Sequence, residues 1–494
     1  MAIHFFLKAR SWFTRTALAA ITTLAVAIPA IAVEPTDVKI RVAAGERQAF
    51  AGMGASVANF DNNYGKLPKS TRHELAKMIW TDLRFDILRL WTQTYDYAPT
   101  PGARDLSVFK KQYIDSHVLP DAHKFGARTL LLAPDNLPVH MRQADADGHI
   151  SLKQSETENY AKLIADQIVQ LDKELGVKIN ATGIQNEPSD EQRISPEQLA
   201  TIVRVLRAEL NARGKRDVKI IATENASAND VFVNELDVLK RDADAWSAIS
   251  GISSHSYNMA ATEEVAKRIA GDDGRSVKDY WMTEAAENGH EKPNDAHRAM
   301  SVSGRFLNDM NHRVTHWIHF LAYENVRKED NATCILTFTN DASPTVTPFL
   351  KYHTYMQLMN TFDHGAVFRH CTSSLEGEMH WTYGLKPRIV VASAKNPDGS
   401  WGVGIVNFTA DDFESVQGWG DKEWNRTQGG HTPAQTFRVT IQIEELVGQQ
   451  PVEIVVSRTS AAYVHKEERV TLRDGIVTIN VSSLELVTLR SMYK

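Results

Sequence analysis

The chain has 494 residues, of which 43% are hydrophobic and 23% are charged, a balance typical of a globular protein with a large core. Its formal net charge is −6 at pH 7 without long runs of one sign, so charge gives no case for binding nucleic acid or an anionic membrane. CxxC, HExxH, GxGxxG and GxxxxGK[ST] motifs are absent from the sequence, which therefore lacks the usual markers of metal, dinucleotide and P-loop chemistry.

Residues 1–32 have the pattern of a secretory signal peptide. Basic residues precede an apolar run at 17–28, and Ala30-Ile31-Ala32 provides small residues at a cleavage site. The apolar run of about 12 residues is shorter than the ~20 that a membrane-spanning helix needs. We therefore expect cleavage rather than an uncleaved anchor, a secreted or periplasmic location, and no later membrane segment.

From residue 48 to residue 384, short apolar runs alternate with amphipathic segments. The stretch 156–176 shows the helical pattern: its apolar residues recur three and four apart, Gly176 ends it, and Ser155 with Glu158 forms an expected capping box. Strands are expected at 48–56, 85–91, 127–134, 179–184, 219–224, 251–257, 279–284 and 316–323. This alternation predicts an α/β fold, a (β/α)8 TIM barrel, with a doubly wound open sheet as the alternative.

After residue 385 the pattern becomes purely β. Residues 388–409 contain two β runs joined by an Asn-Pro-Asp-Gly turn, and further alternating runs follow. We predict an all-β sandwich at 385–494, appended to a catalytic barrel at 48–384, with an N-terminal strand within 33–47 joining the sandwich. The two cysteines, Cys334 and Cys371, could pair in an exported protein, but no spacing motif decides this.

Polar residues gather where the predicted barrel strands end, which is the face that carries function in such barrels. They are Arg89, Asp96, Asn186, Glu187, Glu224, His255, Tyr257 and Glu284. Glu187 and Glu284 end the fourth and seventh strands, on opposite sides of the ring. Hydrolysis of a glycosidic bond needs two carboxyl groups that flank one acetal carbon. The two glutamates therefore predict a glycosidase.

The segments Gly-Ile-Gln-Asn-Glu-Pro at 183–188 and Trp-Met-Thr-Glu at 281–284 resemble the two signatures of the clan A retaining glycosidases, and in detail those of glycoside hydrolase family 30. That family joins a (β/α)8 barrel to a β-sandwich built from both chain ends, and the resemblance covers roughly residues 38–494. It implies a retaining β-glycosidase that works by double displacement through a covalent glycosyl-enzyme intermediate, without a metal or organic cofactor. The alternatives are a related clan A hydrolase with another sugar preference, such as a glucuronidase or arabinofuranosidase, or a glycan-binding protein on an inactive barrel.

The resemblance assigns roles to the strand-end residues. It implies that Glu187 is the general acid/base, kept protonated by its surroundings, and that Glu284 is the nucleophile. Asn186 matches an asparagine that hydrogen-bonds the sugar 2-hydroxyl. Arg89 matches a cation that favours the ionised nucleophile, although it could instead be a structural ion-pair partner inside the barrel. Glu287 is a rival carboxylate, but the Trp-x-Thr-Glu frame favours Glu284.

Other residues are expected to bind or frame the sugar. Asp96 stands where glucosylceramidase-like members hold sugar hydroxyls. Tyr257 is expected to hydrogen-bond the nucleophile, while His255 either binds the substrate or is a rim histidine with satisfied hydrogen bonds. Trp317 either forms the floor of the sugar site or packs in the core, and Glu224 either supports a neighbour or faces bulk water.

The segment 130–142, LLLAPDNLPVHMR, departs from the family pattern. The family usually has Ser-Pro-Trp after the third strand and a second tryptophan downstream, which supply rings for sugar stacking. Here Asp135 replaces the first aromatic residue and His140 the second. We expect both residues to influence substrate choice. The expected partner is a carbohydrate with β-linked galactose, glucose or xylose, cleaved by a monomer.

Overall fold

A computed structural model describes residues 34–58, 60–144, 148–189, 192–257, 259–271, 278–326, 331–377, 379, 387–411 and 433–492. The expected signal peptide lies outside these residues. Among the helices of the described part, none is both long enough and apolar enough to cross a bilayer.

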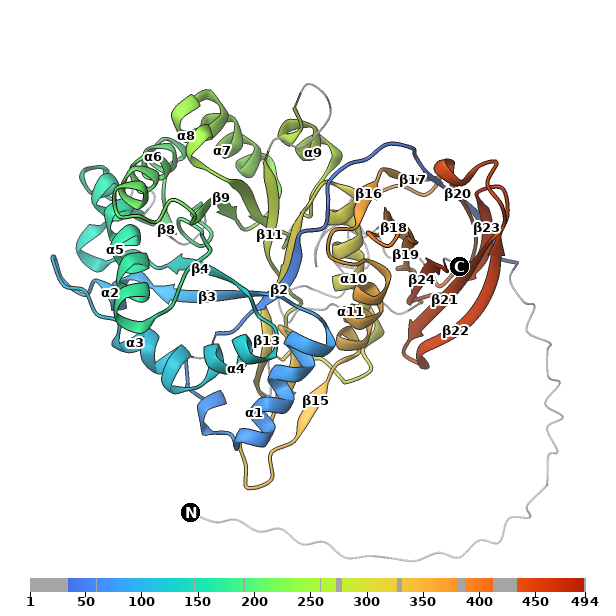
Figure 1. Ribbon diagram of the computed structural model, residues 1–494, viewed down its shortest axis with the longest axis horizontal. Coiled ribbons are helices and arrows are strands. Elements are labelled where there is room, and N and C mark those ends of the chain that lie inside the picture. The colour runs from blue at the N-terminus through green and yellow to red at the C-terminus, as the bar shows by residue number, and fades with distance from the viewer. Residues whose placement is uncertain are drawn as a thin grey trace, which may run out of the picture. The chain divides into compact units, whose positions relative to one another are not determined.

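The larger part of the described chain is a closed ring of parallel strands surrounded by helices (Figure 1). In ring order the strands are β2 (Gly52–Ser56), β3 (Ile87–Gln93), β4 (Thr129–Asp135), β7 (Ala181–Thr182), β9 (Lys219–Asn225), β10 (Gly251–His255), β11 (Asp279–Ala285) and β12 (His316–His319). Ring order follows chain order, and β12 returns to pair with β2, where His316 lies opposite Gly52. The predicted (β/α)8 barrel is confirmed, and ring closure excludes the open-sheet alternative.

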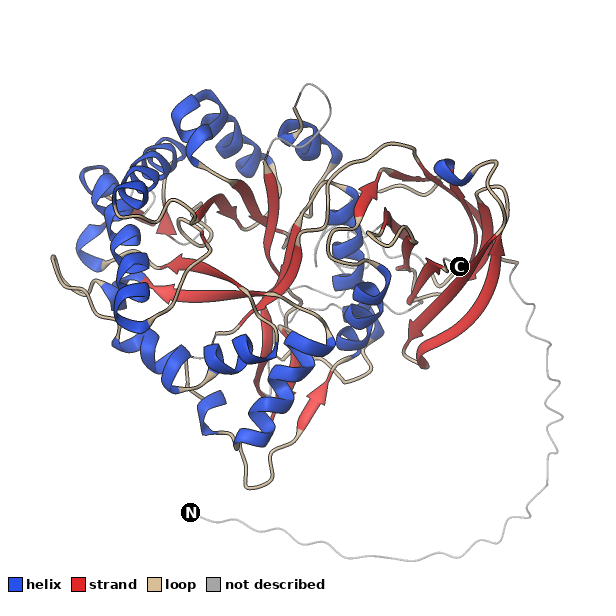
Figure 2. Ribbon diagram, in the orientation of Figure 1, coloured by secondary structure: helices blue, strands red, loops and turns tan. Residues whose placement is uncertain are grey.

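Helices lie outside the strands, as the colouring in Figure 2 shows. The longer ones are α1 (Lys69–Ala76), α4 (Val118–Phe125), α5 (Thr157–Leu175), α6 (Pro196–Ala212), α7 (Asp230–Arg241), α9 (Glu263–Ile269), α10 (Ala296–Asn311) and α11 (Leu350–Thr361). Helix α5 ends as predicted at Gly176, whose φ of 69° is left-handed. The predicted capping box at its start is wrong, because Ser155 belongs to a preceding 3-10 turn. A capping box forms instead at α6, between Ser195 and Gln198.

The predicted eighth strand is interrupted. Residues 316–323 divide into β12 in the barrel and β13 (Leu321–Asn325), which leaves the ring. Strand β13 pairs with β14 (Cys334–Phe338), which in turn pairs with β15 (Val346–Pro348). Because the chain changes sheets after His319, side chains beyond that residue no longer follow the alternation of the barrel.

The C-terminal domain consists of two sheets. One contains β17 (Cys371–Ser373), β1 (Thr36–Val42), β20 (Phe437–Ile443) and β23 (Ile476–Val481); the other contains β16 (Val367–Arg369), β18 (Ile389–Lys395), β19 (Trp401–Asn407), β24 (Glu485–Ser491), β21 (Val452–Ser460) and β22 (Tyr463–Leu472). Their inner faces share one hydrophobic cluster, to which Val439 and Ile405 contribute from opposite sheets. The all-β sandwich is confirmed as part of the fold class.

One boundary of the sandwich differs from the sequence-based expectation. The boundary predicted after residue 384 is too late, because β16 and β17 already belong to the two sheets. Pairing of the two cysteines, which the sequence leaves open, does not occur: no disulfide joins Cys334 in β14 to Cys371 in β17, and both side chains are buried. The sandwich is attached to the barrel through α11, where the buried Gln357 donates hydrogen bonds to the Ser457 carbonyl at 2.7 Å and to Thr488 Oγ1 at 3.2 Å.

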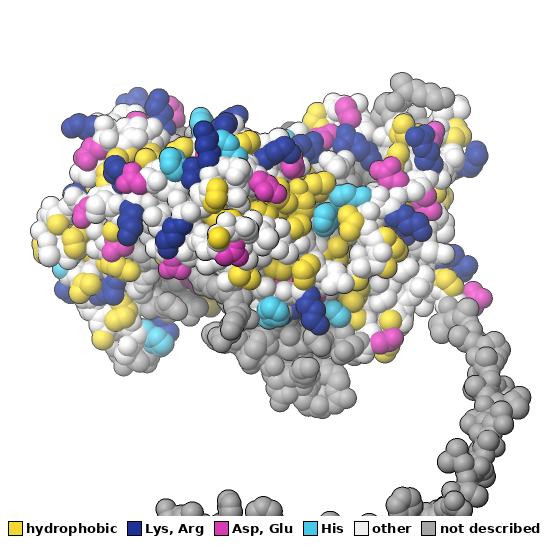
Figure 3. Space-filling model, turned by 90° about the horizontal axis from the view of Figure 1, so that it is seen from below, with side chains coloured by type: hydrophobic (Ala, Val, Ile, Leu, Met, Phe, Trp, Pro, Cys, Tyr) yellow, Lys and Arg dark blue, Asp and Glu magenta, His cyan; other side chains and the backbone are white. Residues whose placement is uncertain are grey.

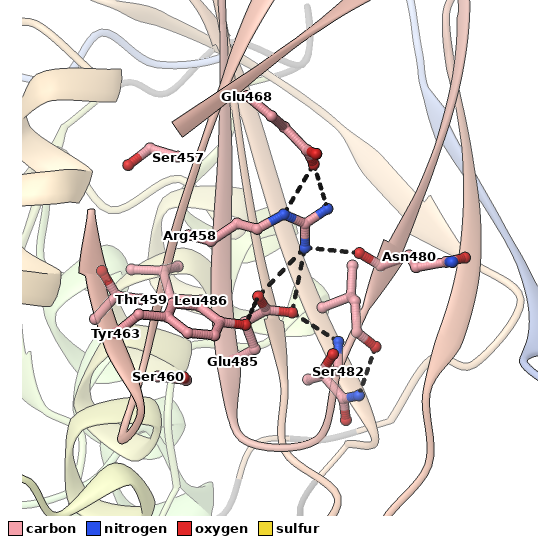
Figure 4. A network of polar contacts seen from close by, with 12 residues as sticks. Ser457, Arg458, Thr459, Ser460, Tyr463, Glu468, Asn480, Ser482, Glu485 and Leu486 are labelled. Carbon is pink, nitrogen blue, oxygen red and sulfur yellow. Dashed lines mark hydrogen bonds and ion pairs between the residues drawn. The ribbon is translucent and has the colours of Figure 1, made fainter. Parts of the chain in front are cut away.

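A charged network connects the two sheets around Arg458 (Figure 4). From β21, Arg458 donates to Glu468 Oε1 at 2.8 and 2.9 Å, to both oxygens of Glu485 at 3.3 Å, and to the Asn480 carbonyl of the other sheet at 2.8 Å. Glu485 has no exposed surface. It also accepts hydrogen bonds from Tyr463 Oη at 2.6 Å and from the Ser482 backbone at 2.7 Å. The buried negative charge of Glu485 is therefore compensated by these partners and not by water.

Replacing Glu485 by Gln should destabilise the sandwich by about 3 kcal/mol, because the substitution leaves Arg458 with a single carboxylate and removes a buried ion pair. The matched change Glu468→Gln affects a half-exposed partner of the same arginine and should cost below about 1 kcal/mol. Chemical denaturation of the full chain measures both. Equal losses for the two variants would contradict the importance assigned to the buried carboxylate.

Candidate active site

Backbone irregularities are concentrated at the carboxyl ends of neighbouring barrel strands. The register shifts between Ser253 and Ser254 where β10 pairs with β9, and between Ser254 and His255 where β10 pairs with β11. Bulges of this kind change the direction in which side chains point. Here the shift brings His255 opposite Glu284, so these two residues from adjacent strands meet at the barrel mouth.

Three residues at the same rim have left-handed backbone conformations that are unusual for side chains of their kind. Asn136 has a φ of 51°, Glu187 of 47° and Glu224 of 71°. Such conformations cost on the order of 1–3 kcal/mol each and persist where surrounding structure enforces them. Gly183 contributes to that enforcement, because a Cβ at this position would lie 3.0 Å from the Glu224 carboxylate. The glycine thus lets Glu224 approach the strand that leads to Glu187.

A fully buried Arg89 lies at the centre of the site. Its Nη1 donates to Glu284 Oε2 at 2.5 Å, and its Nη2 donates to Glu224 Oε2 at 3.0 Å and to Asn186 Oδ1 at 2.8 Å. The guanidinium also lies 4.9 Å from the centre of the Trp91 ring. Burial alone lowers the pKa of Arg89, but the carboxylates of Glu224 and Glu284 outweigh it and raise that pKa. Arg89 is therefore a permanent cation that fixes three side chains at once.

Both oxygens of Glu284 are held. Arg89 occupies Oε2, and the Tyr257 hydroxyl donates to Oε1 at 2.6 Å. Burial, followed by the nearby Glu284 charge, raises the pKa of Tyr257 well above its ordinary value, so the hydroxyl remains a donor. The Glu284 side chain is only 6% exposed. A carboxylate held at both oxygens has a fixed orientation before any reaction begins.

Glu187 is more accessible, with 23% of its side chain exposed, and it pairs with His255. Glu187 Oε1 lies 2.9 Å from His255 Nδ1. Burial by itself raises the pKa of Glu187, but the hydrogen bond and charge of His255, together with Arg89, hold that pKa below its ordinary value. These influences favour the ionised form of Glu187, whereas the resemblance implies a carboxyl group kept protonated by its surroundings. The sequence names His255 as a site residue but does not show its contact with Glu187.

Glu187, His255 and Glu284 form a compact group in which one carboxylate or ring atom of each lies within 4.8 Å of the others. Such a group has the size of a metal site, but its donor atoms already serve other partners. Arg89 and Tyr257 occupy both oxygens of Glu284, and the nearest ring nitrogen of His255 faces Glu187. A metal ion would have to compete with the buried guanidinium, so the chemistry of this set suits proton transfer better than metal binding.

Asp135 lies on the adjacent part of the rim in a network of amide side chains. It accepts hydrogen bonds from Gln93 Nε2 at 2.9 Å and from Asn136 Nδ2 at 2.8 Å, and Asn136 also donates to Gln93 Oε1 at 2.6 Å. Burial raises the pKa of Asp135 to about 6, against the lowering effect of these hydrogen bonds and of Arg89. The network offers hydrogen-bonding groups where an aromatic ring would offer a stacking surface.

Three predicted site residues lie outside the group that Arg89 forms with the two glutamates and His255. Asp96 lies on α2 (Thr94–Tyr97) beside a small pocket with Asp105, and no hydrogen bond in the described chain links it to either glutamate. His140 lies in the 3-10 turn Val139–Met141, and its Nδ1 is buried without a hydrogen-bond partner among the described residues. Trp317 as a sugar-binding residue is wrong. It has no exposed surface, and its indole nitrogen donates to Asp309 Oδ2 at 3.0 Å in the layer between strands and helices.

The structure adds two residues to the site. The sequence leaves two interpretations open for Glu224, and the structure makes it a buried ion-pair partner of Arg89 at 3.0 Å. Gln93, which contacts Asp135, was not singled out. Its position directly after the β3 strand was the available signal, since polar residues that end barrel strands face the functional rim.

Comparisons with known proteins agree with this architecture. No protein-family model matches the chain, and none of the curated proteins matches it in sequence. The catalytic domain of GH30 xylanase C from Talaromyces cellulolyticus is 15% identical and aligns with a TM-score of 0.65 over 92% of this chain and 100% of that chain. SrfJ from Salmonella typhimurium is 13% identical, with a TM-score of 0.66 over 93% of each chain. The endo-beta1,6-glucanase BT3312 is 17% identical, with a TM-score of 0.64 over 92% of this chain and 94% of that chain.

The chain has the fold of glycoside hydrolase family 30. Because the alignments cover more than nine-tenths of the chain, the family 30 likeness includes the sandwich as well as the barrel. Identities of this size establish the architecture only.

Asp135 should make the protein less stable as the pH rises. Its pKa is raised from 3.8 to about 6, so the folded state binds more protons than the unfolded state between these values. This contribution to stability is complete below the unfolded pKa and is lost as the pH rises through the folded pKa. Asp135→Asn should therefore flatten the decline in unfolding free energy between about pH 4 and pH 7. Denaturation across this range, with the exposed Asp115→Asn as control, measures the effect; an unchanged slope would contradict it.

Proposed function

We propose that the protein is a retaining β-glycosidase that hydrolyses a β-linked oligo- or polysaccharide by double displacement. Glu187 acts as general acid/base and Glu284 as nucleophile. The proposal includes export, because residues 1–32 have the signal-peptide pattern, and action as a monomer, since all groups of the site come from one barrel.

The observation that carries the proposal is the separation of the two carboxylates. An oxygen of Glu187 and an oxygen of Glu284 lie within 4.8 Å of each other. Retaining glycosidases hold their carboxyl groups about 5–5.5 Å apart, whereas inverting enzymes leave about 6.5–9.5 Å for a water molecule. The short separation supports direct attack by Glu284 on the sugar.

In the first step, Glu284 attacks the anomeric carbon while the glycosidic carbon–oxygen bond breaks. Glu187 transfers a proton to the departing oxygen, so the leaving sugar departs as a neutral alcohol. Arg89 and Tyr257 fix the Glu284 carboxylate before the reaction, which reduces the entropic cost of reaching the attacking geometry.

In the second step, a water molecule replaces the departed group. The Glu187 carboxylate removes a proton from this water, the resulting oxygen bonds to the anomeric carbon, and the ester bond to Glu284 breaks. Because Asn186 Oδ1 accepts from Arg89, the amide Nδ2 is left to donate to a sugar hydroxyl. This orientation suits the 2-hydroxyl contact that strengthens in the transition state.

The side chains at the rim of the barrel favour a neutral substrate that is rich in hydroxyl groups. Asp135, Gln93 and Asn136 offer both donors and acceptors for hydroxyl groups. On the face drawn in Figure 3, acidic and basic side chains are interspersed rather than gathered into a patch of one sign. Together with the formal net charge of −6 at pH 7, a face of this kind gives no electrostatic steering of polyanions, so a neutral glycan is favoured over a strongly charged one.

Loss of the proposed nucleophile should abolish hydrolysis. Glu284→Gln should lower kcat by roughly 10⁴-fold or more on aryl β-galactosides, β-glucosides or β-xylosides, whichever the wild type cleaves. The matched control is Glu287→Gln, which changes the rival carboxylate just after the end of β11. Proton NMR of the first product should show retained anomeric configuration. An inverted product, or greater loss with Glu287→Gln than with Glu284→Gln, would overturn the assignment.

Glu224 should tune the nucleophile through Arg89. In Glu224→Gln the guanidinium charge is no longer shared, so Arg89 interacts more strongly with Glu284 and makes that carboxylate less nucleophilic. We expect kcat/KM to fall by about tenfold or more, since a change of one pKa unit corresponds to a factor of ten. Steady-state kinetics beside the surface control Glu209→Gln measures this. Unchanged kinetics would reduce Glu224 to a packing residue.

A further inference from the structure

The contact between Glu187 and His255 contains a proton. At 2.9 Å, Glu187 Oε1 and His255 Nδ1 are within hydrogen-bonding distance. Neither a carboxylate nor an unprotonated ring nitrogen is a donor, so one hydrogen must lie between the two atoms. His255 is fully buried, and its other ring nitrogen has no hydrogen-bond partner within the described chain. Glu187 is thus the one group with which the imidazole exchanges a hydrogen bond in the described part.

The charges around His255 favour its protonated form. Glu187 and Glu284 approach it, Glu224 lies on the other side of Arg89, and the Tyr257 ring packs edge-on against it at 6.0 Å. Three carboxylates thus surround one permanent cation. Burial lowers the pKa of His255, but Glu284 and then Glu187 outweigh this effect and raise it above the ordinary value.

The raised pKa of His255 and the lowered pKa of Glu187 describe the same state, an imidazolium beside a carboxylate. A general acid, however, must carry its proton on the carboxyl group when the glycosidic bond breaks. The ionised pair and the neutral pair contain the same number of protons. They differ only in whether the shared hydrogen is bonded to Nδ1 of His255 or to Oε1 of Glu187.

We propose that His255 stores the catalytic proton and delivers it to Glu187 when substrate covers the pair. The inference rests on the proposed glycosidase function. The Nδ1–H bond breaks as the Oε1–H bond forms, which leaves neutral imidazole and a carboxylic acid; the acid then protonates the departing oxygen. Removal of water by the bound sugar drives the transfer, because low polarity favours a neutral pair over an ionised one.

The proton returns to His255 during the second step. Once Glu284 is esterified, its negative charge is lost, and with it the strongest influence that raises the pKa of His255. The imidazole therefore stays neutral and leaves Glu187 as the base that accepts a proton from water. When the ester breaks, the Glu284 charge returns and the proton moves from Glu187 back to His255. His255 acts through Glu187 and need not touch the sugar.

The test uses two substrates that differ only in their leaving group. An aryl glycoside with an unactivated phenyl group needs a proton to leave, whereas 2,4-dinitrophenolate leaves without one. In His255→Asn, kcat/KM for the phenyl substrate should fall at least about tenfold near neutral pH, with its basic limb moved at least about one unit lower. The dinitrophenyl substrate should lose less than about threefold. The control His123→Asn, at an exposed position, should match the wild type.

An unmoved basic limb in His255→Asn, or equal losses on both substrates, would overturn the inference and leave His255 a structural role. Failure of the wild type to cleave any glycoside would instead refute the glycosidase proposal itself. If His255→Asn does not fold, histidine-labelled nitrogen NMR of the wild type gives the answer. Esterification of Glu284 by a 2-deoxy-2-fluoro glycoside should convert one imidazolium signal to neutral imidazole, and no such conversion would overturn the inference.

Discussion

The guanidinium of Arg89 is the interaction on which the geometry of the site depends. Arg89 lies on β3, and its guanidinium contacts side chains from β9, from β11 and from the segment after β7. The arginine side chain therefore crosses the interior of the barrel mouth. A buried cation is stable only when carboxylates and hydrogen-bond acceptors surround it closely. The positions of Glu284 and Glu224 are therefore consequences of one electrostatic requirement. Without it, two buried carboxylates would repel each other across the same space.

The regular barrel provides rigidity, and local departures from regularity provide the chemistry. Strands β9, β10 and β11 keep standard pairing through their buried middles and lose register only near their carboxyl ends. Left-handed residues occur at the same level, at Glu187 and Glu224. Because strand pairing below the rim is intact, the barrel can hold conformations that an isolated loop would abandon. The packing of the barrel below the rim thus offsets the strain of these left-handed conformations.

Sequence reasoning succeeded where information is local. Hydrophobic periodicity revealed the strands and helices, and the motifs around Glu187 and Glu284 marked the ends of two strands. It leaves alternatives open where a tertiary contact decides the role of a residue. Trp317 illustrates this: its neighbour Ile318 faces the interior cluster of the barrel, so alternation turns Trp317 outward against Phe306 and Tyr355. The position of His255 opposite Glu284 depends on a bulge, and no sequence spacing reports a bulge.

The parallel pairing of β1 with β20 has a consequence for the history of each molecule. Thr36 lies opposite Phe437 and Val42 opposite Ile443, so the first strand of the described chain pairs with a neighbour some 400 residues later in the sequence. Ribosomes deliver a chain from its amino end, so all barrel segments are complete before β20 exists. Strand β1 therefore stays unpaired on that side until β20 has been synthesised. A truncation before Phe437 would remove β20 and leave that side of β1 permanently unpaired, which exposes a β edge far from the site of the truncation.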